Sequence, residues 1–295
     1  MKVLLCGSKG QLGIAVKKFC PENFVLFDKS KEELDICDLY NLKKCINLIK
    51  PDIIINAAAY TAVDDAEKNK VIAKKINCQG PYNLAQISNE KKIKIIHIST
   101  DYVFDGYSKY PYTEEDTPNP LSYYGKTKFM GEKILNDNCK NYLIFRVSWL
   151  YGPDKKNFLT KILKAGVNNK KISVVSDQIS IPTSTFEFSK FLWKVCENII
   201  QDSSNYGLYH YSGSGSSISR YEFVKTIFSY SKKFGYKSPL IKPILSEDFE
   251  SIQIRPKYSC LNNNKALKTF NFTNKNWKDS LKEILEEIFQ KNRLS

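Results

Sequence analysis

A tyrosine and a lysine that stand four residues apart, Tyr124 and Lys128, are the pair in this sequence best suited to proton transfer. If a helix begins near Tyr124, Lys128 lies one turn further on the same face. An ammonium group beside a phenol favours the phenolate and lowers the phenol pKa from its usual value of about 10. We therefore predict that Tyr124 donates a proton to a developing alkoxide, with Lys128 assisting.

Thr100 adds a hydroxyl group to this pair, because it directly follows an apolar, strand-like run over 94–99. Ligands of doubly wound sheets bind at the carboxyl ends of the strands. At such an end the Thr100 hydroxyl can bond the carbonyl oxygen of a substrate beside Tyr124. The spacing of a tyrosine and a lysine arises by chance in lysine-rich chains, so the prediction of a carbonyl-reducing site depends on all three residues together.

A glycine loop, Gly7-x-x-Gly10-x-x-Gly13, stands between a predicted strand over 2–6 and a predicted helix over 11–19. The backbone of such a loop can approach a pyrophosphate, and the helix N-terminus attracts its negative charge. Asp28 ends the second predicted strand, where an acid can accept hydrogen bonds from the ribose of adenosine. Loop and acid together favour a dinucleotide site over a plain tight turn with a surface Asp.

The elements that must position these residues alternate along the first half of the chain. Continuous apolar strands between helices are typical of a parallel sheet covered on both faces. The predicted fold is therefore α/β, a Rossmann-type doubly wound parallel sheet. The predicted strands lie at 2–6, 24–27, 52–56, 94–99 and 142–146, and the predicted helices at 11–19, 39–49, 71–89 and 126–136.

The second half is less regular, and we place the domain change near Tyr151. Residues 1–150 are predicted to form the dinucleotide-binding domain, completed by part of 185–212. Residues 151–295 are predicted to form a smaller, interleaved substrate domain. Within it the patterns indicate helices at 186–200, 220–234 and 281–289, and a Gly- and Ser-rich loop at 212–219.

Composition argues against several other classes of protein. The net charge is +14, but nearly all of the positive charge is dispersed lysine, whereas specific nucleic-acid recognition favours arginine. We therefore expect no nucleic-acid partner, although the positive field would attract an anionic ligand. Eight scattered cysteines without a C-x-x-C pair, and two histidines, predict reduced thiols and no metal site. Without a long apolar run or signal pattern, we expect a cytoplasmic protein with no membrane partner.

Taken together, the motifs resemble those of extended short-chain dehydrogenase/reductases, specifically the dTDP-4-dehydrorhamnose reductase family, along nearly the whole chain. The most specific run is Ser-Thr-Asp-Tyr-Val-Phe-Asp-Gly at 99–106. Other matching stretches are 7–13, 33–36, 56–64, 124–128, 146–152, 177–178, 182–183, 207–210 and 255–256.

The resemblance implies reduction of the C4 keto group of a dTDP-4-dehydro-6-deoxy-L-sugar to dTDP-L-rhamnose, with NADPH or NADH as cofactor. It implies a dTDP-sugar as partner and leaves a homodimer open. For the 2′-phosphate of NADPH, Lys9, Lys29 and Ser30 are the candidates. Matching catalytic positions are Thr100, Tyr124 and Lys128. Matching cofactor positions are Gly7, Gly10, Gln11, Leu12, Gly13, Asp28, Asp35, Ile36, Ala57, Ala58, Ala59, Tyr124 and Lys128, and matching substrate positions are Val103, Phe104 and Trp149.

The chain departs from the family pattern at three places. Tyr60 stands where the family often has His, and Ile179-Ser180-Ile181 stands where a glycine is usual. Ala15 replaces a Glu that in some members is linked to a metal-bridged dimer, so no metal is carried over. Two alternatives stay open: a non-catalytic subunit like the methionine adenosyltransferase beta subunit, and another sugar-nucleotide reductase, epimerase or dehydratase.

Overall fold

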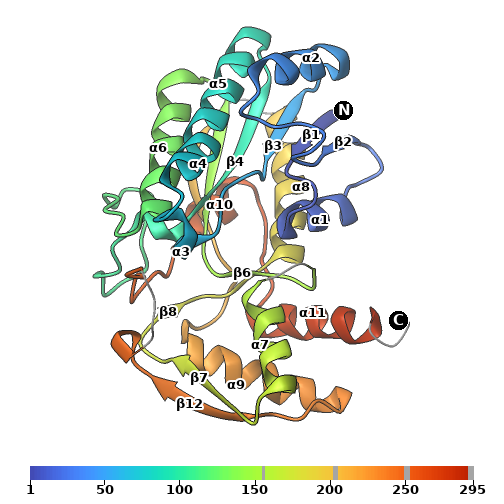
Figure 1. Ribbon diagram of the computed structural model, residues 1–295. Coiled ribbons are helices and arrows are strands. Elements are labelled where there is room, and N and C mark those ends of the chain that lie inside the picture. Colours follow the sequence, from blue (N-terminus) through green and yellow to red (C-terminus); the bar gives the residue numbers. More distant parts are fainter. Residues whose placement is uncertain (155–156, 202–204, 249–252, 292–295) are drawn as a thin grey trace.

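The computed structural model describes residues 1–154, 157–201, 205–248 and 253–291. At its centre is a six-stranded sheet in the order β10-β5-β4-β3-β1-β2, in which every pairing is parallel (Figure 1). This confirms the predicted Rossmann-type fold. The strands are β1 (Lys2–Cys6), β2 (Val25–Lys29), β3 (Ile53–Asn56), β4 (Lys94–Thr100), β5 (Tyr142–Val147) and β10 (Gly207–Tyr211).

Helices cover both faces of this sheet, because its inner strands are apolar on both sides. All four residues of β3 are buried, and alternate strand residues join two different hydrophobic clusters. One face packs against α1 (Gln11–Lys18), α8 (Thr185–Gln201) and α10 (Asn264–Thr269). The other face packs against α2 (Leu39–Ile49), α5 (Gly80–Lys91) and α6 (Tyr123–Asn138).

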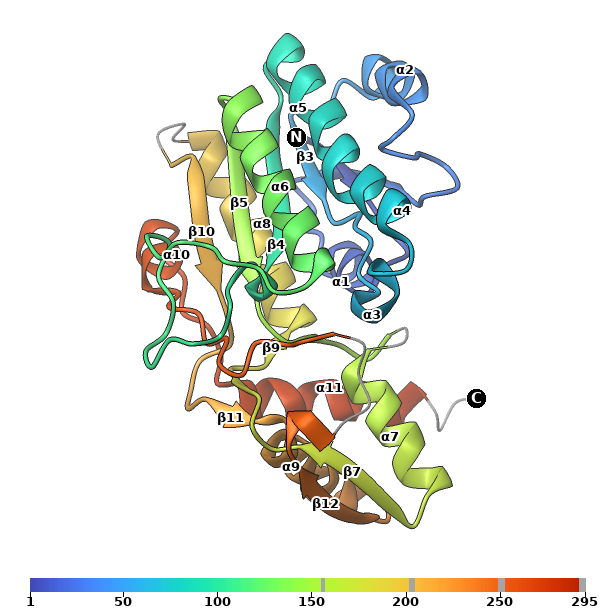
Figure 2. The same ribbon diagram turned by 60° about the vertical axis from the view of Figure 1, so that its left-hand side comes forward.

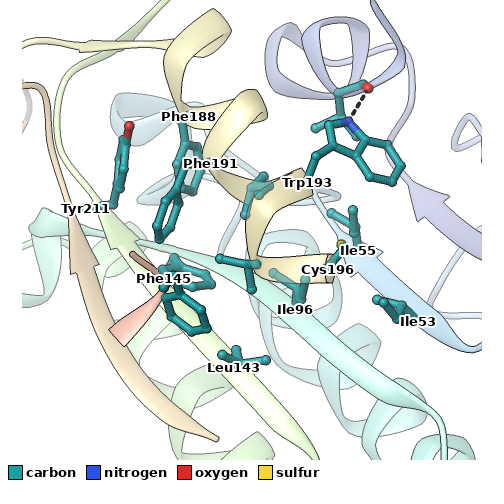
Figure 3. Close-up of a cluster of buried hydrophobic side chains, with 14 of the residues drawn as sticks. Ile53, Ile55, Ile96, Leu143, Phe145, Phe188, Phe191, Trp193, Cys196 and Tyr211 are labelled. Carbon is teal, nitrogen blue, oxygen red and sulfur yellow. Dashed lines mark hydrogen bonds between the residues drawn. The ribbon is translucent and has the colours of Figure 1, made fainter. Parts of the chain in front are cut away.

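Aromatic side chains fill the core beneath α8 (Figure 3). Phe191 lies 4.5 Å from the ring of Tyr211 and 5.3 Å from that of Phe145, between centroids. The indole N–H of Trp193 donates to the carbonyl oxygen of Val16, 2.9 Å away, and so satisfies its one polar group. Residues from both halves of the chain therefore share one core.

The helix predicted over 71–89 differs from the prediction, because it contains a π-helical turn. It consists of α4 (Lys70–Lys74), the π turn η1 (Lys75–Gln79) and α5. Buried Asn77 in this turn donates to the carbonyl of Tyr60, at 3.1 Å, and to Oγ1 of Thr127 on α6, at 3.0 Å. The turn therefore joins this helix to α6 through polar contacts that an apolar period cannot reveal.

Most of the remaining elements lie below the large sheet, whereas α3 (Val63–Ala66) lies beside α4 (Figure 2). The helix predicted over 220–234 is α-helical only to Ser231, and the loop predicted over 212–219 includes a short strand. No helix in the described ranges is long and apolar enough to cross a bilayer. The main elements here are α7 (Phe158–Asn168), α9 (Arg220–Ser231), α11 (Trp277–Lys291) and three strand pairs: β6 (Leu150–Tyr151) with β9 (Thr183–Ser184), β7 (Lys171–Val175) with β12 (Leu240–Ile244), and β8 (Ile179–Ser180) with β11 (Ile218–Ser219).

Candidate active site

Two cavities meet at the glycine loop, and both are lined by Gly10, Ala57 and Ala59. The first, here the loop cavity, measures about 200 Å³ and is also lined by Gly7, Lys9, Lys31, Glu32, Leu34, Asp35, Ile36, Ala58 and Ile76. The second, here the tyrosine cavity, measures about 400 Å³, and its further lining includes Gln11, Leu12, Thr100, Asp101, Tyr124, Lys128, Trp149, Phe158 and Arg220.

The glycine loop has the geometry that a phosphate cradle requires. Gly7 has a φ of 83°, and a Cβ on it would lie 2.8 Å from the backbone nitrogen of Ala58. Gly10 is the N-cap residue of α1, and no side chain bonds the free N–H groups there. The N-terminus of that helix therefore opens directly onto both cavities. Gly13 lies within the first turn of α1 and lines neither cavity.

Of the acids expected beside the adenosine, the structure brings Asp35 to the loop cavity, together with Ile36. Asp28 does not line this cavity. Its carboxylate instead pairs with Nζ of Lys17 on α1, at 2.6 Å, and this contact lowers the pKa of Asp28. Among the candidates for a 2′-phosphate, Lys9 lines the cavity, whereas Lys29 and the buried Ser30 do not.

Tyr124, Lys128 and Thr100 all line the tyrosine cavity, so the structure brings the three predicted catalytic residues together. The Ser122 hydroxyl caps α6 by accepting from the Gly125 N–H, at 3.1 Å. A Cβ at Gly125 would clash with the carbonyl oxygen of Tyr102, so only glycine allows α6 to approach the turn that follows β4 this closely.

The electrostatics of Tyr124 differ from the prediction, because burial raises its pKa. Contact with the Thr100 side chain opposes this rise, but Lys128 is not among the causes. Nζ of Lys128 donates to the carbonyl oxygen of Ile98, at 2.6 Å, and also lies 3.3 Å from Nε2 of His97. Burial lowers the pKa of Lys128 itself to about 8. The ammonium is thus directed at β4 rather than at the phenol.

Asp101 is a site residue whose role sequence reasoning missed, although it stands beside Thr100. The Thr100 hydroxyl accepts from the Tyr102 N–H, at 3.2 Å, and donates to Oδ1 of Asp101, at 3.1 Å. The other carboxylate oxygen, Oδ2, is buried without a hydrogen-bond partner among the described residues. Burial raises the pKa of Asp101 to about 6.

Trp149 and Arg220 form the far wall of the tyrosine cavity. The guanidinium of Arg220 stacks on the rings of Trp149 and Phe158, and Trp149 has a φ of 43°, in the left-handed region. Strained backbone of this kind is concentrated at functional sites. Sequence reasoning did not single out Arg220, although an isolated arginine in a lysine-rich chain was an available signal.

Val103 and Phe104 do not line the cavity, although the family resemblance implied substrate contact there. Both are fully buried in a cluster with Tyr112 and Leu261. The ring of Phe104 stacks on that of Tyr112, with 4.0 Å between centroids. The structure thus gives the side chains of Val103 and Phe104 a packing role.

A buried ion pair holds α6 on the sheet. Arg146 on β5 donates to both carboxylate oxygens of Glu132, from Nε at 3.0 and 3.2 Å and from Nη2 at 2.7 Å. The Ser99 hydroxyl donates to the same carboxylate. Because Glu132 lies one turn beyond Lys128, this cluster fixes the helix that carries the predicted catalytic pair.

Comparison with known proteins identifies one family over nearly the whole chain. The family model described as the RmlD substrate binding domain matches residues 1–290. The dTDP-4-dehydrorhamnose reductase of Aggregatibacter actinomycetemcomitans is 35% identical over 288 residues, which cover 96% of this chain and 98% of the relative.

Solved structures of dTDP-4-dehydrorhamnose reductases are also similar to this chain over nearly its whole length. The structure of dTDP-4-dehydrorhamnose reductase from Bacillus anthracis in complex with NADP has a TM-score of 0.89 at 35% identity, covering 97% of this chain and 99% of that one. An orthologue from Clostridium acetobutylicum has a TM-score of 0.89 at 38% identity, covering 98% and 99%. The chain therefore belongs to the dTDP-4-dehydrorhamnose reductase family of extended short-chain dehydrogenase/reductases.

Proposed function

We propose that this protein reduces the C4 keto group of dTDP-4-dehydro-6-deoxy-L-mannose to give dTDP-L-rhamnose, a step of nucleotide-sugar biosynthesis for cell-surface polysaccharide. The observation that carries the proposal is the meeting of Thr100, Tyr124 and Lys128 in a cavity that adjoins a glycine-loop cavity. A non-catalytic subunit would need no such arrangement. The names of the relatives support the choice of substrate.

NADPH or NADH is the proposed cofactor, and the two cavities fit a dinucleotide. The loop cavity would hold the adenosine against Asp35 and Ile36, and the N-terminus of α1 would hold the pyrophosphate. Gln11 and Leu12 line the tyrosine cavity, where the nicotinamide end would lie and Lys128 could reach its ribose. When bound, the cofactor supplies a hydride to the carbonyl carbon.

The chain's own residues supply the proton. As negative charge develops on the substrate oxygen, the Tyr124 hydroxyl donates its proton to that oxygen, which leaves a phenolate. The high pKa of Tyr124 keeps the phenol protonated and ready to donate. The Thr100 hydroxyl, which now bonds Asp101, is placed to donate to the same substrate oxygen.

Two features support an anionic sugar nucleotide as the substrate. Arg220 presents a cation to the tyrosine cavity, and the net charge of the chain is +14. Trp149 offers an aromatic face of the kind on which sugar rings pack. We further propose that residues 1–150, with parts of 185–212, form the cofactor domain, and that the rest of 151–295 forms the substrate domain. The eight free thiols support a cytoplasmic location.

The test is an NADPH-oxidation assay with a panel of nucleotide-linked 4-keto-6-deoxy sugars. We expect turnover with the dTDP-linked L-sugar. Tyr124→Phe should lower kcat by roughly 10²–10⁴, the usual contribution of general acid catalysis, and keep NADPH binding. Lys128→Met should weaken cofactor binding as well, and Thr100→Val should cost less than Tyr124→Phe. A wild-type protein that reduces none of the panel, or a Tyr124→Phe variant with full turnover, contradicts the proposal.

A further inference from the structure

His97 is a buried titratable residue that the proposed reaction does not use. It lies on β4, has 1% of its surface exposed, and stands between Asn56 on β3 and Lys128 on α6. Its Nδ1 lies 3.0 Å from Nδ2 of Asn56, and its Nε2 lies 3.3 Å from Nζ of Lys128. Burial and the neighbouring Lys128 lower the pKa of His97 well below its usual value, so the ring is neutral and carries one N–H.

The position of that ring hydrogen follows from the orientation of Asn56. The Asn56 amide oxygen accepts from the backbone N–H of Ala58, at 3.2 Å, and a backbone N–H can only donate. The amide NH2 of Asn56 must therefore face His97 and donate to Nδ1. Since Nδ1 accepts, the ring hydrogen lies on Nε2 and points at Nζ of Lys128.

A ring N–H that faces Lys128 discriminates between the two forms of the lysine. An ammonium group has only donors, so it meets the Nε2–H of His97 donor to donor. A neutral amine has a lone pair, and it can accept from Nε2–H while it donates to the Ile98 carbonyl. The contact therefore favours the neutral amine and penalises the charged form.

The other histidine of the chain has the opposite tautomer. Nδ1 of His210 lies 3.0 Å from the carbonyl oxygen of Tyr112, which can only accept, so Nδ1 carries the hydrogen. Its Nε2 lies 3.4 Å from Nη1 of Arg146, which can only donate. His210 thus provides an internal reference for His97.

We propose that Asn56 and His97 are positioning residues that make Lys128 a proton-exchanging amine rather than a permanent cation. After Tyr124 has given its proton to the substrate, the Lys128 ammonium gives a proton to solvent water in the tyrosine cavity, which both residues line, and that water gives a proton to the phenolate. Tyr124 becomes a phenol again and Lys128 becomes an amine, which accepts a hydrogen bond from His97. Solvent water then returns a proton to Lys128. This catalytic consequence rests on the proposed function, whereas the tautomer does not.

The charged and titratable groups around Lys128 are compatible with this role. Glu132, on the same helix, raises the pKa of Lys128, but that carboxylate is already paired with Arg146. Cys78 from the π turn also raises it. Burial outweighs both, and the resulting value of about 8 lies close to neutral pH. Lys128 can therefore give and regain a proton within the operating range.

The first test reads the tautomers directly by nitrogen NMR of the full-length protein labelled with ¹⁵N-histidine. Only two histidines contribute signals, and a His97→Gln spectrum assigns them. At neutral pH we expect His97 to be protonated at Nε2 and His210 at Nδ1. A His97 ring protonated at Nδ1, or at both nitrogens, overturns the proposal. This readout needs no substrate, so it remains decisive even if the reductase assay fails.

The second test moves the ring hydrogen with one nearly isosteric change. In Asn56→Asp, the carboxylate can still accept from Ala58 but can no longer donate to Nδ1. The hydrogen should move to Nδ1, and Nε2 should accept from the Lys128 ammonium. We expect the pKa of Lys128 to rise by roughly 1–3 pH units, as it does beside an opposite charge.

The readouts of the second test are the lysine ¹³Cε signal that is absent from Lys128→Met and the pH profile of kcat. The pKa read from the ¹³Cε signal and the pH profile of kcat should both shift to higher pH, and the tautomer of His97 should change at the same time. A shift of either without a change of tautomer would reflect the added charge alone and would overturn the proposal. If Asn56→Asp does not fold, the wild-type spectrum decides the question.

Discussion

The guanidinium carbon of Arg220 lies 3.7 Å from the centroid of the Trp149 ring and 4.5 Å from that of the Phe158 ring. These two cation–π contacts hold the cation in the tyrosine cavity, where it has no ion-pair partner among the described residues. A guanidinium held in this way keeps its fork of N–H donors for an anionic ligand. The Trp149–Arg220 pair is therefore the best-defined candidate contact for the diphosphate of a sugar nucleotide.

Arg220→Gln should raise KM for the sugar nucleotide by roughly tenfold to a hundredfold, which corresponds to the loss of a charged hydrogen bond. The kcat and the Kd for NADPH should change little, because the proton donor and the glycine loop are not touched. Steady-state kinetics and a cofactor titration measure these quantities. Lys225→Gln, an exposed change on the same helix, is the control. An unchanged KM in Arg220→Gln would exclude contact with the substrate.

Asp101→Asn should stabilise the protein at alkaline pH. The folded pKa of Asp101 is about 6, above its ordinary value of 3.8, so the fold disfavours the carboxylate. The destabilisation is absent below pH 4, grows as the pH rises through 4 to 6, and is complete above that window. The difference between the two pKa values corresponds to about 3 kcal/mol. Urea unfolding should show Asp101→Asn to be more stable than wild type at pH 8 and equal to it at about pH 3, below the unfolded pKa. Equal stability at pH 8 would refute the prediction.

Glu132→Gln should destabilise the fold strongly, because it leaves the buried Arg146 guanidinium without its counter-charge. Breaking one partner of a buried pair costs about 3–5 kcal/mol. Thermal unfolding should show a clear fall in Tm. The matched control is Glu286→Gln, which breaks the exposed pair with Lys233 and should cost less than about 1 kcal/mol. Similar losses of Tm in both variants would show that the buried pair contributes no more to stability than the exposed pair does.

The choice between NADPH and NADH should depend on an exposed ion pair at the loop cavity. Nζ of Lys9 lies 3.3 Å from Glu32, and both residues line the cavity. Glu32→Gln removes a negative charge that repels a 2′-phosphate, so the ratio of kcat/KM for NADPH over NADH should rise by roughly two- to fivefold. Lys9→Met should lower this ratio by a similar factor. A change in the same direction in both variants would indicate that neither side chain faces the phosphate.

From the sequence it was possible to predict those parts of the site that depend on the spacing of residues along the chain. Tyr124 and Lys128 share one helix face, and Thr100 ends a strand, so spacing alone brings them to one edge of the sheet. The orientation of a side chain could not be predicted in this way, because it depends on contacts with other elements. Asp28 stands at the expected place in β2, but Lys17 on α1 holds its carboxylate away from the cavity.

Properties that depend on burial also could not be predicted from the sequence. The predicted lowering of the Tyr124 pKa assumed that the Lys128 ammonium faces the phenol, whereas desolvation decides the value and raises it. Val103 and Phe104 follow Thr100 closely, yet a 3-10 turn (Asp101–Val103) directs the chain into the core. The π turn likewise depends on Asn77 meeting Thr127, a contact between residues 50 positions apart.

The place of β10 at the end of the sheet has a consequence for biosynthesis. Its residues 207–211 pair with β5, and Phe270, which directly follows α10, packs against Phe145 of β5 and Tyr209 of β10 in the same core. A ribosome that has released only the first 150 residues has therefore made a sheet whose β5 edge is open and whose aromatic core is half built. Because open strand edges pair with other chains, the nascent protein is exposed to aggregation until β10 and Phe270 have been synthesised.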